Sequence, residues 1–153
     1  MAHLYERVVT FLESEGWPVE KVEGRTALRT SHEDDNGQWN CVAMVNEDEA
    51  RLVFFSVFPH DVKANRYTAV GEYLNRANYG LPVGNFEIDY SDGMVRFKTS
   101  IEFGEADASP ELIGPVVYAN VTVMNRYLPG LLRVVQGTAP EKAIEDTEKN
   151  SSE

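Results

Sequence analysis

The sequence predicts an α+β fold in which helices pack against an antiparallel sheet, with elements in the order α-βββ-α-ββ-α. Two pairs of strand-like segments are joined at Asn36-Gly37 and at Asp92-Gly93, which are favoured two-residue hairpin loops. The other long segments repeat apolar residues at helical spacing. Alternating strands with helices between them are typical of a sheet that has one face covered by helices.

The first helix is predicted at residues 2–15. Leu4, Val8 and Leu12 recur at intervals of about one helical turn and therefore share one face. Gly16 follows this apolar stripe and ends the helix.

Three strands are predicted next, at residues 27–32, 39–46 and 51–58. The first two are joined by Asn36-Gly37, the strongest short hairpin signal in the chain. A polar turn connects the second strand to the third. We therefore expect these three strands to form an antiparallel meander.

The third of these strands is apolar on both faces. One face carries Leu52, Phe54 and Phe58, and the other carries Val53, Phe55 and Val57. A strand with this pattern is typically buried on both sides. Helices cover one face, so something else is expected to cover part of the second.

The second helix is predicted to begin after Pro59, where Asp61 can cap it. Its apolar stripe consists of Tyr67, Val70, Leu74 and Ala77. Gly80 ends the stripe and therefore the helix.

The segment 85–101 predicts a second hairpin. With Asp92-Gly93 as the loop, the facing pairs are Tyr90 with Val95, Asp89 with Arg96, Ile88 with Phe97 and Glu87 with Lys98. One face of this hairpin is then apolar, and the other pairs opposite charges. Such pairs each contribute about 0.2–1 kcal/mol.

A long helical stripe runs over residues 110–135, and Pro129-Gly130 is expected to bend it. A short helix follows through Ile144. We expect residues 1–145 to form a single domain and residues 146–153 to form a polar tail.

Charge and hydropathy restrict the function. The chain has 14 basic and 25 acidic residues and a net charge of −11, which disfavours nucleic acid and anionic membrane surfaces as partners. No apolar run approaches the roughly 20 residues of a membrane span. The N-terminal segment carries charges where a signal peptide needs an apolar core. We therefore expect a cytoplasmic protein with no nucleic-acid or membrane partner.

Few residues of the sequence suggest catalysis or metal binding. A two-residue loop at Asn36-Gly37 would place His32 opposite Cys41, and a Cys–His pair can form an activated thiolate. The alternative is a buried cysteine beside a histidine, with no orienting partner. The three histidines, which include His60, lack metal-motif spacing. We expect no catalytic residue, cofactor or metal site.

Three segments carry a family resemblance: Leu81–Tyr90 with Val95–Lys98, Asn125–Pro129, and Ala139–Ile144. In order and spacing they resemble the YbjN-domain family of bacteria and cyanobacteria, whose members are described as sensory transduction regulators. The family shares its fold with the chaperones of type III secretion systems. The resemblance implies a YbjN-like domain in a cytosolic homodimer that binds other polypeptides, and it supplies no catalytic residues.

These observations lead to a hypothesis of a non-enzymatic regulatory or chaperone-like protein that binds a protein or peptide partner as a homodimer. The candidate partner-binding or dimer residues are Val53, Phe55, Val57, Tyr73 and Trp39. The alternative for these residues is an ordinary core. Two other functions stay open: a small-molecule sensor or small enzyme with a site between helix and sheet, and a passive adaptor with one dedicated partner.

Overall fold

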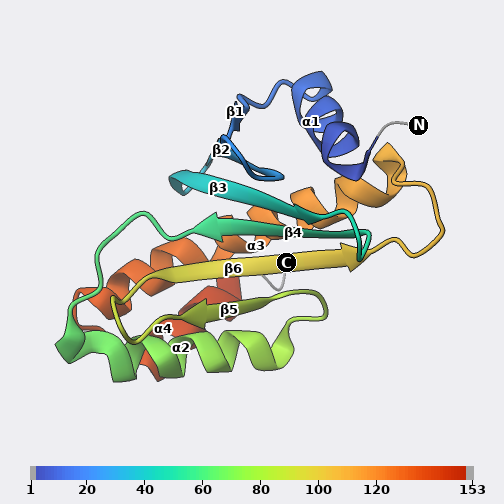
Figure 1. The fold of residues 1–153 in the computed structure, drawn as a ribbon. Coiled ribbons are helices and arrows are strands. Elements are labelled where there is room, and N and C mark those ends of the chain that lie inside the picture. The colour runs from blue at the N-terminus through green and yellow to red at the C-terminus, as the bar shows by residue number, and fades with distance from the viewer. Residues whose placement is uncertain (1–2, 151–153) are drawn as a thin grey trace.

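A computed structural model describes residues 3–150 of the chain. One antiparallel sheet of six strands, in the order β1-β2-β3-β4-β6-β5, packs against helices (Figure 1). The α+β prediction is therefore confirmed. In chain order the elements are α1 (Leu4–Ser14), β1 (Glu20–Lys21), β2 (Ala27–Asp34), β3 (Gly37–Asn46), β4 (Arg51–Val57), the 3-10 turn η1 (Ala64–Arg66), α2 (Tyr67–Gly80), β5 (Asn85–Ile88), β6 (Val95–Glu102), α3 (Pro110–Val135) and α4 (Pro140–Asn150).

The sheet has two unlike faces. The long helix α3 crosses behind the sheet in Figure 1, while α2 lies along the β5 side. We call the face against α3 the inner face and the opposite one the outer face. The inner face supplies Leu28, Cys41, Phe54 and Phe97 to the core, and all four are fully buried.

The helix α1 is held to the sheet at its first turn. The backbone N–H groups of Leu4 and Tyr5 donate to the two carboxylate oxygens of Glu47, each at 3.0 Å. A carboxylate suits this position because the first N–H groups of a helix have no partner within the helix. Glu47 lies in the turn between β3 and β4 and therefore joins that turn to α1.

The loop between β2 and β3 consists of Asp35 and Asn36 rather than Asn36 and Gly37, since Asp34 pairs with Gly37. The cause lies in α3. The Asn36 backbone N–H donates to Asn125 Oδ1 at 2.9 Å, and Asn36 Nδ2 donates to the Asn125 carbonyl at 2.8 Å.

That carbonyl is available because of Pro129. In a regular helix the Asn125 carbonyl accepts from the N–H four residues later, and proline has none. Asn36 supplies the missing donor. The predicted bend at Pro129 does not break the element, because α3 continues as one helix through Val135.

The hairpin of β5 and β6 is also shifted by two residues from the predicted pairing. Ile88 pairs with Val95 and Glu87 with Arg96, so the loop is longer than two residues. The Asp89 carbonyl accepts from the Gly93 N–H at 2.7 Å, which stabilises the wider turn. A shift of two keeps every side chain on its predicted face.

Three further boundaries differ from the predictions. The two-residue strand β1 pairs with β2 and was not predicted, since so short a strand carries no alternation. The helix α2 begins at Tyr67, after a 3-10 turn, rather than after Asp61. The helix α4 runs past residue 145, where Asp146 pairs with Arg133 of α3 at 3.2 Å. Residues 151–153 of the predicted tail lie outside the described part of the chain.

A side chain of α2 hydrogen-bonds to the free edge of β5, the strand at one end of the sheet. Asn78 Oδ1 accepts from the Phe86 N–H at 2.7 Å, and Asn78 Nδ2 donates to the Phe86 carbonyl at 3.0 Å. The amide side chain thus satisfies both backbone groups that a neighbouring strand would satisfy.

Candidate partner-binding surface

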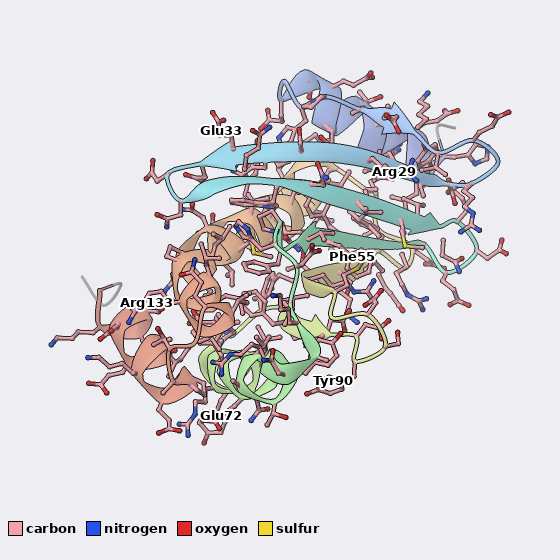
Figure 2. All side chains as sticks on the ribbon, turned by 90° about the vertical axis from the view of Figure 1, so that its left-hand side faces the viewer. Arg29, Glu33, Phe55, Glu72, Tyr90 and Arg133 are labelled. Atoms are coloured by element: carbon pink, nitrogen blue, oxygen red, sulfur yellow. The ribbon has the colours of Figure 1, made fainter. Side chains whose placement is uncertain are left out.

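The outer face of the sheet carries a group of apolar side chains that we call the apolar centre: Val42, Met44, Val53, Phe55 and Val57. They come from β3 and β4, where strand alternation directs them away from α3. Met44 is 45% exposed, and the three valines are half-buried. Figure 2 shows Phe55 on the side of the sheet opposite α3, the helix that carries Arg133.

Phe55 is only 6% exposed although it lies on this open face. The guanidinium of Arg96 lies over its ring at 4.1 Å from the centroid, which is cation–π geometry. Val42 and Lys98 flank Phe55 on the neighbouring strands. A charged side chain of β6, rather than a helix, therefore covers this phenylalanine.

Arg96 is held in place by a shared carboxylate. Arg96 Nε donates to Glu87 Oε1, and Lys98 Nζ donates to Glu87 Oε2 at 3.2 Å. Burial favours a higher pKa for Glu87, but its hydrogen bonds and ion pairs with the two cations outweigh burial and hold the pKa below its ordinary value. Glu87 therefore stays ionised at neutral pH.

A hollow of about 470 Å³ borders the apolar centre on the β2 side. It is lined by the segment Pro18–Glu20 and by residues of β2, β3 and β4 that include Arg29, Ser31, Val42 and Val57. We call it the β2 hollow. Val42 and Val57 belong to both features, so the hollow and the apolar centre form one continuous surface.

Two of the five predicted surface residues lie in the core instead. Trp39 is on the inner face, and its indole Nε1 donates to Ser56 Oγ at 2.9 Å. Tyr73 of α2 is fully buried, and its hydroxyl donates to the Tyr127 carbonyl at 2.9 Å. Neither residue is available to a partner in this conformation, and Val53, Phe55 and Val57 remain as candidates.

The structure does not bring His32 and Cys41 into the expected pair. Because the hairpin register is shifted, His32 faces Trp39 and Cys41 faces Thr30. The His32 ring stacks on Trp17 with centroids 5.0 Å apart. Cys41 is fully buried, which raises the pKa of its thiol to about 12. A thiol with this pKa is protonated at neutral pH and is a poor nucleophile.

The third chemical candidate, His60, packs its ring against Phe58 at 5.2 Å between centroids. Within residues 3–150, no group of three or more His, Cys, Asp or Glu side chains is arranged to hold a metal ion. Over the same residues, no helix is both long enough and apolar enough to cross a bilayer.

Sequence reasoning missed part of this surface. Val42 and Met44 alternate with the inner-face residues Cys41 and Ala43, so alternation along the strand could have placed them beside Phe55. The position of Arg96 over the ring follows from the pairing of β4 with β6, which joins segments far apart in the sequence and has no local signal.

Comparison with known proteins identifies the relatives of this chain. A family model described as "YbjN: Putative bacterial sensory transduction regulator" matches residues 4–133. The chain belongs to the YbjN family. The resemblance noted in the sequence is thereby confirmed for most of the length of this YbjN-family protein.

Two solved structures are similar to this YbjN-family protein. The crystal structure of YbjN from E. coli, described as a putative transcription regulator, has a TM-score of 0.60 and 8% identity, covering 95% of this chain and 92% of that one. At this identity the likeness concerns the fold alone. A crystal structure of the ExsC–ExsE complex has a TM-score of 0.49 and 13% identity, covering 82% of this chain and 91% of that one. No curated protein matches the sequence.

Proposed function

We propose that this protein is a non-enzymatic, polypeptide-binding protein with a regulatory or chaperone-like role in the cytoplasm. The observation that carries the proposal is the apolar centre on the outer face, open at Met44 and continuous with the β2 hollow. Membership of a family described as regulators supports it. The partner is a protein or peptide rather than nucleic acid or an anionic membrane surface, because the net charge of −11 repels both of the latter.

The arrangement of the outer face suits a protein interface. Half-buried aliphatic side chains lie at its middle, and ion pairs such as Arg51–Glu102 at 2.6 Å and Arg29–Glu20 at 3.3 Å lie around them. Apolar centres with polar rims are typical of interfaces that assemble from folded partners. A bound segment would be held by mass action, which keeps it soluble or inactive while it is bound.

We further propose that the protein acts as a homodimer. Two molecules that each carry −11 repel one another, so they associate most easily through a surface on which charges are already paired.

The test combines light scattering with crosslinked co-purification from native cytosol. We expect the wild-type protein to be a dimer that carries one or a few discrete polypeptides. Met44→Asp and Phe55→Asp should lose the partner or the dimer while keeping the fold, because each places a charge in the apolar centre. Tyr79→Asp is the matched control, since Tyr79 is 96% exposed on α2, outside this surface.

A bare monomer without a partner would contradict the proposal. If Phe55→Asp unfolds the protein while Met44→Asp leaves both the fold and the binding intact, Phe55 is a core residue and this surface is wrongly assigned. Circular dichroism of each variant separates loss of binding from loss of the fold.

A further inference from the structure

The charges that border the apolar centre are unevenly distributed. In the pairing of β4 with β6, Val57 lies beside Arg96 and Phe55 lies beside Lys98. Both charged neighbours of Phe55 on β6 are therefore basic. On the other side of Phe55, β3 contributes only the uncharged Val42.

The carboxylates of the outer face lie at its margins. Glu87 is on the edge strand β5, Glu20 is on the edge strand β1, Glu33 is next to the end of β2, and Glu102 is the last residue of β6. The middle of this face is therefore bordered by cations, although the chain as a whole carries −11.

The two cations beside Phe55 have unused hydrogen-bonding capacity. A guanidinium has five N–H donors and an ammonium has three. Among residues 3–150, Arg96 Nε and Lys98 Nζ each donate one side-chain hydrogen bond, both to the carboxylate of Glu87. Since one carboxylate is shared between two cations, donors remain on both for a second carboxylate.

We propose that the outer face selects a polypeptide segment in which an aspartate or glutamate stands next to an aliphatic side chain. The incoming carboxylate binds Arg96 and Lys98, and the aliphatic side chain packs on Val42 and Val57 at the entrance to the β2 hollow. This inference rests on the proposed function, because it specifies the chemistry of the partner at the same surface.

Charge complementarity distinguishes this occupant from its alternatives. A lysine in the partner would meet Arg96 and Lys98 as like charges, which is unfavourable close to apolar side chains. An uncharged segment would leave the spare donors of both cations without a charged acceptor. An acidic and aliphatic segment satisfies the donors and covers the valines at once.

The test uses three labelled synthetic heptapeptides that differ in the polar residue and therefore in charge. Each alternates leucine with aspartate, asparagine or lysine, and binding is followed by fluorescence anisotropy at about 0.15 M salt, where long-range repulsion is screened. We expect the aspartate peptide to bind at least about tenfold more tightly than either of the others, which corresponds to one charge-assisted contact.

Three variants locate the preference. Arg96→Gln and Lys98→Gln should each reduce it several-fold. Lys98→Gln is the more decisive, because Arg96→Gln also uncovers Phe55. Arg76→Gln is the matched control: it removes a cation that also pairs with a carboxylate, Glu72 at 2.8 Å, but on α2. The control should bind the three peptides as the wild-type protein does.

The outcomes separate this inference from the proposed function. Equal binding of the aspartate and asparagine peptides, abolished by Met44→Asp, would overturn the charge preference and leave polypeptide binding at this surface intact. Preference for the lysine peptide would overturn it as well. If no peptide binds and the wild-type protein carries no cellular partner, both proposals fail.

Discussion

The thiol of Cys41 shows how the position of one residue sets its reactivity. Its side chain lies on the inner face with Sγ 3.6 Å from Ser56 Oγ, and no part of it reaches solvent. Burial raises its pKa because a thiolate loses its hydration in the core. The only cysteine of the chain is therefore a structural residue.

We predict that Cys41 resists alkylation in the folded protein. Iodoacetamide needs the thiolate and access to it, and both are lacking at neutral pH. Mass spectrometry should find the native protein unmodified after a time in which the urea-unfolded chain is fully alkylated. Comparable rates in the two states would show that Cys41 is accessible and would restore the nucleophile hypothesis.

Gly130 is a residue at which a single methyl group matters. A Cβ built there collides with the Tyr73 hydroxyl of α2 and the Thr147 hydroxyl of α4. We predict that Gly130→Ala lowers the free energy of unfolding by about 1–3 kcal/mol, the usual cost of overpacking, as measured by urea denaturation.

Gly114→Ala is the control for this effect in the same helix. A Cβ there meets Phe11 Cζ at 3.5 Å, an ordinary contact. Alanine should therefore be neutral or stabilising by up to about 1 kcal/mol through its helix propensity. Equal behaviour of the two variants would show that the close approach at Gly130 is relieved by small shifts of α2 and α4.

Among the elements, α3 positions the others through two of its asparagines, Asn120 and Asn125. The carbonyl of Asn125 accepts a hydrogen bond from Asn36 in the β2–β3 loop. On its sheet side, Asn120 Nδ2 donates to the carbonyls of Phe54 and Phe97 at 2.9 and 3.1 Å. One helix thus fixes a hairpin loop and the joint between β4 and β6.

A double-mutant cycle tests the role of Pro129. Asn36→Ala should cost about 1 kcal/mol of unfolding free energy, because it removes the Nδ2 hydrogen bond to Asn125. In a Pro129→Ala background the new N–H can donate to the Asn125 carbonyl, so the cost of Asn36→Ala should fall by at least about 0.5 kcal/mol. Costs that add without coupling would contradict this explanation of the register.

The elements show which parts of the fold are encoded locally. Alternation placed the strands, and the face of each hairpin residue was predictable because a shift of two preserves it. The registers of the hairpins could not be predicted in the same way. The β2–β3 loop hydrogen-bonds to Asn125 of α3, which is distant in the sequence. The end of α4 was missed for the same reason, because it is fixed by packing on α3 rather than by its polar sequence.

At the scale of the whole molecule, the net charge sets which partners can approach. We predict no binding to a 30-base-pair duplex at protein concentrations up to about 100 µM and about 0.15 M salt, a range in which non-specific binding by basic proteins is readily seen. Electrophoretic mobility provides the measurement. A salt-sensitive complex would contradict this prediction and reveal a basic surface used for nucleic acid.

The candidate surface was predictable only in part. Two-sided apolar character in residues 51–58 correctly indicated that Val53, Phe55 and Val57 face away from the helices. Trp39 is a candidate from sequence because tryptophan is common both in interfaces and at core edges, and Tyr73 is one because it lies beside the main apolar stripe of its helix, but both are buried. Their burial follows from tertiary packing alone.

The amide of Asn78 has a consequence for how this molecule can misassemble. Because it occupies the Phe86 N–H and carbonyl, a strand from another chain finds no free template there. Pairing of a strand from another chain with β5 is therefore hindered at Phe86. Asn78→Ala would free both backbone groups and make this edge more open to such pairing.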